Sequence, residues 1–259
     1  MSGNIDSGTL LDGALTFDTF VPGDCNRFAR TAALAVADDS GQCFNPLYIY
    51  GGSGVGKTHL LHAIGNYAIA RNPTLKVRYV TAGDFSEEFV EAQSQRRTAE
   101  FSRCYRNLDI LLVDDVQSLI GEDDALEQFR RTFCTLSWAN KSIVVASDVA
   151  PWRLDVFGSD LVSRLQAGLA VDVKAPDRDT LVRILRMYAV RGGWKIPDGV
   201  FDLIGASCEV PTNMDRFMEL TRTTLFEMKD RLRGMNDSLN EIRGALRNVG
   251  GGSSKYRDM

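Results

Sequence analysis

One short segment constrains the fold of this chain more than any other. Residues 51–58 read Gly-Gly-Ser-Gly-Val-Gly-Lys-Thr and lie between an apolar run at 47–50 and an amphipathic helical pattern. Glycines in such a turn let the backbone curl until successive N–H groups face one anion, and the following helix adds the positive end of its dipole. A glycine turn that matches by chance is the alternative. The strand before it and the helix after it favour a phosphate-binding loop.

This phosphate loop predicts both a nucleotide and a metal ion. The Lys57 ammonium is expected to reach the β- and γ-phosphates of ATP, and the Thr58 hydroxyl is expected to hold Mg²⁺. The predicted cofactors are therefore ATP or ADP and Mg²⁺. The loop residues expected to contact the nucleotide are Gly51, Gly52, Ser53, Gly54, Val55, Gly56, Lys57 and Thr58.

Acidic residues follow two later apolar runs. Asp114 and Asp115 come directly after residues 110–113, and Asp148 closely follows residues 142–146. Asp114 is predicted to coordinate Mg²⁺, directly or through water, and Asp115 to orient or deprotonate the attacking water. Asp148 is a candidate for contacting the γ-phosphate or positioning that water, with a solvated strand end or a helix cap as the alternative. Downstream of a phosphate loop, the paired aspartates indicate an ATPase.

Composition places the chain among ordinary globular proteins. Its 259 residues are 44% hydrophobic and 25% charged, with a net charge of −4, which excludes extended disorder. No apolar run approaches the ~20 residues that span a bilayer, and no secretory signal is visible, so a cytoplasmic protein is expected. Five scattered cysteines and two histidines argue against a structural zinc site.

Short apolar runs alternate with helical patterns along most of the chain. Nearly continuous runs of Val, Ile, Leu and Tyr are typical of strands buried on both faces of a parallel sheet. The alternation predicts an α/β fold: a five-stranded parallel sheet sandwiched by helices, with a small helical lid domain after it. The predicted strands are 47–50, 76–81, 110–113, 142–146 and 169–173, and the predicted helices are 26–37, 57–71, 86–106 with a break, 122–138, 178–190, 198–207 and 212–232.

Changes in composition divide the chain into four predicted parts. Residues 1–15 are rich in Ser, Gly and Asp and form a predicted flexible leader, and residues 250–259 form a predicted flexible tail. Residues 16–175 form the predicted nucleotide-binding domain. The strand pattern stops after Pro176, so residues 176–249 are assigned to the helical lid domain.

Together these motifs resemble the AAA+ ATPases and, among them, the ATPase domain of the DnaA family of bacterial replication initiators. Residues 45–65 are similar to nearly the whole of that family's phosphate-loop block, and residues 15–29 are similar to the segment that lies against the adenine. Residues 101–117 are similar to the stretch that leads into its paired aspartates. Residues 163–169 are similar to the box that carries its arginine finger. The resemblance covers residues 15 to about 190 well and the rest only weakly.

The resemblance implies an ATP-dependent assembly switch in the initiation of DNA replication. ATP would bind between the sheet and the lid, drive self-association and be hydrolysed slowly. Arg164 would reach the γ-phosphate of a neighbouring copy, while Phe20 and Asn26 would belong to the nucleotide site. His59 is also a nucleotide-binding candidate, although helix packing is the favoured interpretation. The implied partners are further copies of this chain, single-stranded DNA, a replicative helicase, a sliding clamp and a full-length initiator.

Two residues depart from the family pattern. Arg216 is the candidate lid arginine for the nucleotide, but it lies one residue beyond the family's position, and one step on a helix is about 100° of rotation. Asp160 stands where relatives often carry a basic residue before the finger. Sensing of ATP through the lid is therefore open.

Contact with DNA is open as well. Arg96, Arg97, Arg103 and Arg106 suggest a grip on single-stranded DNA, but glutamates are mixed among them, so a solvated face is favoured. No sequence is seen for a module that reads duplex DNA. Two competing functions therefore remain. One is a DnaA-related regulator, or a loader or adaptor for a helicase or clamp, and the other is a nucleotide-bound scaffold without turnover.

Overall fold

A computed structural model of the chain describes residues 11–38 and 44–193, together with 196, 198, 199, 201, 223 and 238. The chain divides into two compact units, residues 1–214 and 215–259, and the helices and strands given below all lie in the first. Arg216, the tail at 250–259 and nearly all of the helices expected at 198–207 and 212–232 lie outside the described residues. The proposed division at residue 176 therefore stays a prediction.

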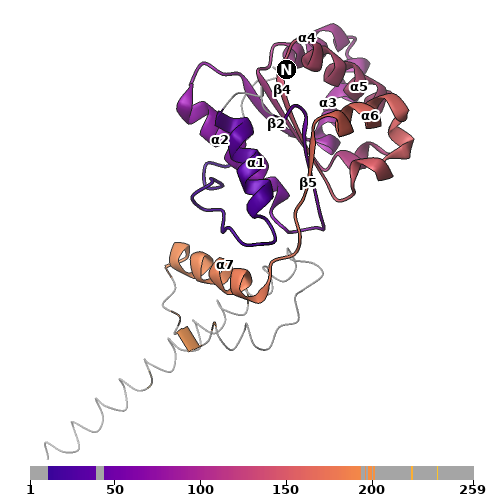
Figure 1. The fold of residues 1–259 in the computed structure, drawn as a ribbon. Helices are drawn as coiled ribbons and strands as arrows, with labels where there is room; N and C mark the ends of the chain where they lie inside the picture. Colours follow the sequence, from indigo (N-terminus) through magenta and orange to yellow (C-terminus); the bar gives the residue numbers. More distant parts are fainter. Residues whose placement is uncertain are drawn as a thin grey trace, which may run out of the picture. The chain divides into compact units, whose positions relative to one another are not determined.

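A five-stranded parallel sheet forms the centre of the first unit (Figure 1). All five predicted strands are confirmed within a residue at each end, and the third and fourth extend far enough to include Asp114 and Ser147. In spatial order the strands are β2 (Val77–Thr81), β3 (Ile110–Asp114), β4 (Ser142–Ser147), β1 (Leu47–Tyr50) and β5 (Leu169–Asp172), and every pairing is parallel.

Helices cover both faces of this sheet, so the predicted α/β fold class is confirmed (Figure 1). One face carries α1 (Arg27–Asp38) and α2 (Lys57–Arg71). The other carries α3 (Ala82–Ser94), α4 (Thr98–Arg106), α5 (Asp123–Trp138) and α6 (Ser159–Ala167). Three short 3₁₀ turns, η1 (Val116–Leu119), η2 (Pro151–Arg153) and η3 (Asp155–Phe157), follow β3 and β4, and α7 (Arg178–Arg191) follows β5.

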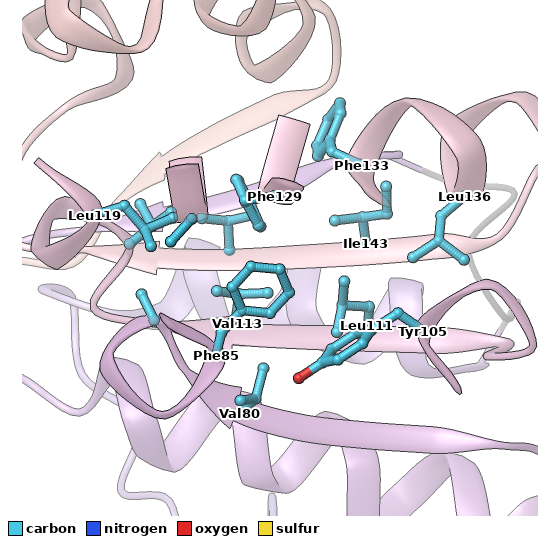
Figure 2. Packing of buried hydrophobic residues seen from close by; sticks show 14 of the residues in the cluster. Val80, Phe85, Tyr105, Leu111, Val113, Leu119, Phe129, Phe133, Leu136 and Ile143 are labelled. Carbon is cyan, nitrogen blue, oxygen red and sulfur yellow. The ribbon is translucent and has the colours of Figure 1, made fainter. Parts of the chain in front are cut away.

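Each face of the sheet has its own hydrophobic core. Successive strand side chains point to opposite faces, so Leu47 joins the core under α1 and α2 while Tyr48 joins the core under α3 to α6. Figure 2 shows the second core, in which the fully buried Phe85 ring meets Tyr105 and Phe129 edge-on, with centroids 5.0 and 5.9 Å away. These packed aromatic rings support the face of the sheet that carries α3 to α6.

The segment before α1 is held against α2. The Asp12 N–H donates to Nδ1 of His62 at 3.1 Å, and the Asn66 amide donates to the carbonyls of Asp12 and Leu15 at 2.8 and 2.9 Å. Residues 11–15, which composition assigned to a flexible leader, are therefore fixed, because polar groups of α2 satisfy their backbone. Among the described residues, no helix is long and apolar enough to cross a membrane.

Candidate nucleotide-binding site

The predicted phosphate loop joins β1 to α2 and has the curvature that an anion cradle needs. Gly54 and Gly56 have φ values of 76° and 103°, in the region that favours glycine. The Gly51 N–H donates to the carbonyl of Ser147 on β4 at 3.2 Å. A Cβ at Gly51 would lie 2.2 Å from the carbonyl oxygen of Val173, just after β5. Two neighbouring strands therefore fix where the loop starts, and only glycine fits there.

Lys57 is the first residue of α2, and its ammonium lies within the loop. Nζ donates to the carbonyls of Gly51 and Gly52 at 3.0 and 2.9 Å and to Oδ1 of Asp148 at 2.7 Å. The lysine side chain is 5% exposed, whereas that of Asp148 is 43% exposed. The structure thus brings together two predicted site residues that are 91 positions apart, with the cation at the mouth of the phosphate cradle.

Thr58 and Asp114 bring two hard oxygen atoms together beside this loop. The Thr58 hydroxyl donates to Oδ2 of the buried Asp114 at 2.6 Å, and the Tyr79 hydroxyl donates to the same oxygen at 3.0 Å. Hydroxyl and carboxylate oxygens suit Mg²⁺, which usually keeps waters and phosphate oxygens as its other ligands. The described part of the chain has no cluster of three or more His, Cys, Asp or Glu able to hold a metal. The two residues therefore fit an ion that is shared with a nucleotide.

Asp115 and Gln117 link the ends of β3 and β4. Asp115 has left-handed backbone angles, φ 52° and ψ 46°, and its Oδ1 accepts a hydrogen bond from Nε2 of Gln117 at 3.2 Å. Oε1 of Gln117 accepts from the Ser147 hydroxyl at 2.8 Å and from the Asp148 N–H at 3.1 Å. Partial burial and the charge of Asp114 raise the pKa of Asp115.

Sequence reasoning assigned no role to Gln117 or Tyr79. The glutamine lies two positions after the paired aspartates, and the tyrosine lies within a strand that reads as apolar. Neither position carries a motif, because each residue acts through a partner on another element. The only sequence signal is for Gln117, a polar residue three positions after Asp114 and the last residue of the family-like stretch 101–117.

The residues predicted near the adenine are engaged in packing. Phe20 is 5% exposed, and its ring meets His59 edge-on with centroids 5.2 Å apart. Nε2 of His59 lies 2.9 Å from the carbonyl oxygen of Thr16, and burial lowers the pKa of this histidine. The Asn26 amide bonds to the backbone of its own segment at 2.8 and 3.1 Å. These side chains support the wall beside the loop, and their contact with a nucleotide stays a prediction.

Arg164 lies on α6, and its described contacts stay within that helix. Nε is 3.3 Å from both carboxylate oxygens of Asp160, one turn earlier, and the arginine side chain is 35% exposed. Within the described ranges, its hydrogen-bond and ion-pair partners include no residue of the phosphate loop. Its predicted action on a neighbouring copy stays a prediction.

Comparison with known proteins identifies the family. The model of the bacterial DnaA ATPase domain matches residues 11–172. The chain belongs to this DnaA ATPase-domain family. A chromosomal replication initiator protein DnaA from Bifidobacterium animalis subsp. lactis is 51% identical over 207 residues, which are 77% of this chain and 36% of that protein.

Solved DnaA structures share the fold of this family member. Domain III of the replication initiation protein DnaA from Thermotoga maritima is 38% identical with a TM-score of 0.81, over 86% of this chain and 92% of that one. A replication initiator DnaA bound to AMPPCP and single-stranded DNA is 31% identical with a TM-score of 0.73, over 93% of this chain and 75% of that one. The predicted family, fold and ATPase class are confirmed.

The match to whole DnaA proteins is partial. The chain spans 36 to 44% of the length of the curated relatives that it matches. The similarity therefore establishes a DnaA-type ATPase domain, and the activities of the longer proteins enter below only as proposals.

Proposed function

We propose that this chain binds Mg²⁺ and ATP at the phosphate loop and acts as an ATP-dependent assembly switch in the initiation of bacterial DNA replication. Slow hydrolysis to ADP and phosphate would reset the switch. The observation that carries the proposal is the convergence of Lys57, Thr58, Asp114 and Asp148 at one glycine-rich loop.

The chemistry follows from these groups. Lys57 binds the β- and γ-phosphates by exchanging its carbonyl partners, Gly51 and Gly52, for phosphate oxygens. Thr58 and Asp114 hold Mg²⁺, which supplies positive charge against the phosphate oxygens when it is bound. Asp115 accepts a hydrogen bond from the attacking water and orients it in line with the γ-phosphate. Asp148 accepts a hydrogen bond from the lysine ammonium at 2.7 Å and would keep it in position beside the γ-phosphate.

Two substitutions test the site. We expect Lys57→Ala to lower ATP affinity at least tenfold, and Asp115→Asn to keep ATP binding but slow hydrolysis about 10²-fold. Nucleotide affinity is measured with a fluorescent ATP analogue, and hydrolysis by single-turnover phosphate release. The matched control is Lys141→Ala, another lysine paired with an aspartate, Asp109 at 2.8 Å, at the opposite ends of the strands. A Lys57→Ala protein that binds and hydrolyses ATP normally would refute the proposal.

We assign assembly to Arg164. Among the described residues its acidic partner is the half-exposed Asp160 at 3.3 Å, a weak pair that a phosphate could replace. With ATP, sedimentation velocity should show self-association that ADP does not support, and Arg164→Ala should abolish it while leaving ATP affinity within threefold. Arg71→Ala, an exposed arginine of α2 paired with Asp38, is the control. Equal assembly by Arg164→Ala and the control would exclude this role.

Single-stranded DNA is the nucleic acid that we propose as a ligand. The supporting surface is a groove of about 650 Å³ between α4 and α5, the arginine groove, and the described residues that line it include no carboxylate. Its cations are Arg103, Arg106 and Arg131, and Arg131 is paired with Glu127 at 2.8 Å. The logarithm of the binding constant falls linearly with the logarithm of the salt concentration, and each phosphate contact with single-stranded DNA contributes about 0.7 to that slope. Replacing Arg103 and Arg106 by alanine should therefore make the slope shallower by about 1.4. Fluorescence anisotropy with a labelled oligonucleotide, with Arg71→Ala as the control, measures it.

The same titration addresses the competing regulator or loader-adaptor. Cytoplasmic location and binding to a replicative helicase, a sliding clamp or a full-length initiator rest on the family alone, and we propose them on that basis. A chain that binds a helicase or clamp in an ATP-dependent manner, but shows no salt-dependent binding to single-stranded DNA, would be an adaptor. A chain that binds ATP with no phosphate release above buffer would be a scaffold.

A further inference from the structure

The side-chain amide of Gln117 has one orientation that satisfies its neighbours. Its oxygen faces two donors, the Ser147 hydroxyl at 2.8 Å and the Asp148 N–H at 3.1 Å, and its nitrogen faces the Asp115 carboxylate at 3.2 Å. A flipped amide would set N–H against N–H and oxygen against carboxylate. The Ser147 hydroxyl is fully buried, so its bond to Gln117 is costly to lose.

These three bonds define the place of Asp115 relative to the rest of the site. Asp115 is only partly buried and sits on a left-handed turn, so packing alone does not fix its carboxylate. Gln117 ties Oδ1 to the end of β4, next to the residue that binds the Lys57 ammonium at 2.7 Å. Among the described residues, Oδ2 of Asp115 has no hydrogen-bond partner, so it is available to a water.

We propose that Gln117 is a positioning residue for ATP hydrolysis. Its amide holds the Asp115 carboxylate at a fixed position relative to Asp148 and the Lys57 ammonium, so that the attacking water is aligned with the γ-phosphate. The inference rests on the proposed function, because it assumes that Asp115 orients this water. It adds a residue to the site that acts only through Asp115 and Asp148.

Two substitutions distinguish the donor role of the amide nitrogen from the acceptor role of the amide oxygen. Gln117→Glu keeps an acceptor for the Ser147 hydroxyl and the Asp148 N–H but loses the donor to Asp115. Gln117→Leu loses both the donor and the acceptor. The matched control is Gln93→Leu, the same change at an exposed position of α3. The 259-residue chain is used throughout, and thermal unfolding checks that each variant is folded.

The readouts separate positioning from a structural role. We expect Gln117→Glu and Gln117→Leu to slow single-turnover ATP hydrolysis about 10- to 100-fold while the Kd for ATP stays within threefold. The affinity for ADP with aluminium fluoride, an analogue of the transition state, should fall by a similar factor. Loss of affinity for ATP and for the analogue by equal factors would show a structural role instead, and hydrolysis within twofold of the unsubstituted chain in both variants would also overturn the inference.

A double substitution distinguishes this inference from the proposed function. If Gln117 acts through Asp115, adding Gln117→Leu to Asp115→Asn should cause no further loss of rate. If Asp115→Asn alone hydrolyses ATP normally, the proposed function has the wrong water-orienting residue. If Asp115→Asn is slow but the Gln117 variants are normal, only the positioning role fails.

Discussion

Replacing Gly51 by alanine is the sharpest test of how the sheet fixes the phosphate loop. The added Cβ would lie 2.2 Å from the carbonyl oxygen of Val173 and 3.2 Å from Cγ2 of Val55, and real Cβ contacts are essentially never under 3.0 Å. The loop or the end of β5 must therefore move by about 0.8 Å, the difference between 2.2 and 3.0 Å. The loop is the less restrained of the two, because Val173 is bonded to Tyr50 at 2.7 Å.

That displacement sets the size of the expected effect. A misplacement of about 1 Å in a site that depends on exact positioning costs about 10²-fold, and overpacking costs about 1–3 kcal/mol of stability. We therefore expect Gly51→Ala to weaken ATP binding about 10- to 100-fold, which is about 1.4–2.8 kcal/mol. The free energy of unfolding should fall by about 1–3 kcal/mol. A fluorescent ATP analogue and urea unfolding measure the two quantities.

The neighbouring Gly52 provides the control. A Cβ there meets nothing within 4 Å, so Gly52→Ala should keep ATP affinity within about threefold and leave the urea midpoint unchanged or slightly higher. Normal ATP binding by Gly51→Ala would show that the contact with Val173 relaxes without disturbing the loop, and the reasoning would be wrong. An equal loss in both variants would mean that any side chain harms the loop, whatever lies beside it.

Three further predictions follow from other parts of the domain. Asp114→Asn removes a charge from the proposed metal pair, so the Mg²⁺ concentration for half-maximal phosphate release should rise at least tenfold; an unchanged Mg²⁺ titration would contradict the assignment. Phe85→Ala empties the centre of the core in Figure 2 and should lower the free energy of unfolding by about 3–5 kcal/mol in urea, and a loss under about 1.5 kcal/mol would mean that the surrounding rings collapse into the space. Burial lowers the pKa of His59 below its ordinary 6.5 in the folded chain, so as pH falls this histidine is protonated in the unfolded chain before it is protonated in the folded one. The neutral ring therefore contributes its full share to the free energy of unfolding above about pH 6.5, and this share decreases at lower pH. Between pH 7 and pH 5 the free energy of unfolding of His59→Gln should fall by less than that of the unsubstituted chain, and an equal fall in the two proteins would rule this out.

Most of the architecture was predictable because its signals are local. The central strands are short apolar runs, and α2 starts at the residue after the last glycine of the loop. Residues such as Lys57 and Thr58 could be assigned from spacing, because a loop between a parallel strand and a helix always presents them to the same place.

The rest depends on contacts between elements that are distant in sequence. The position of Gln117 has meaning only because β3 and β4 are neighbours, which brings its amide to Ser147. Residues 11–15 look like a leader by composition, but Asn66 and His62 on α2 hold their backbone. Composition describes the side chains of such a segment, whereas its order here comes from partners for its N–H and carbonyl groups.

The strand order also has a consequence for synthesis of the chain. β1, which precedes the phosphate loop, lies between β4 and β5, so Leu47 pairs with Val144 and Leu169. Its sheet neighbours emerge from the ribosome only after about a hundred more residues, and such distant pairings form late. The nascent chain should therefore acquire affinity for nucleotide only after β5 has been translated. ATP would then act as a ligand that selects completed domains.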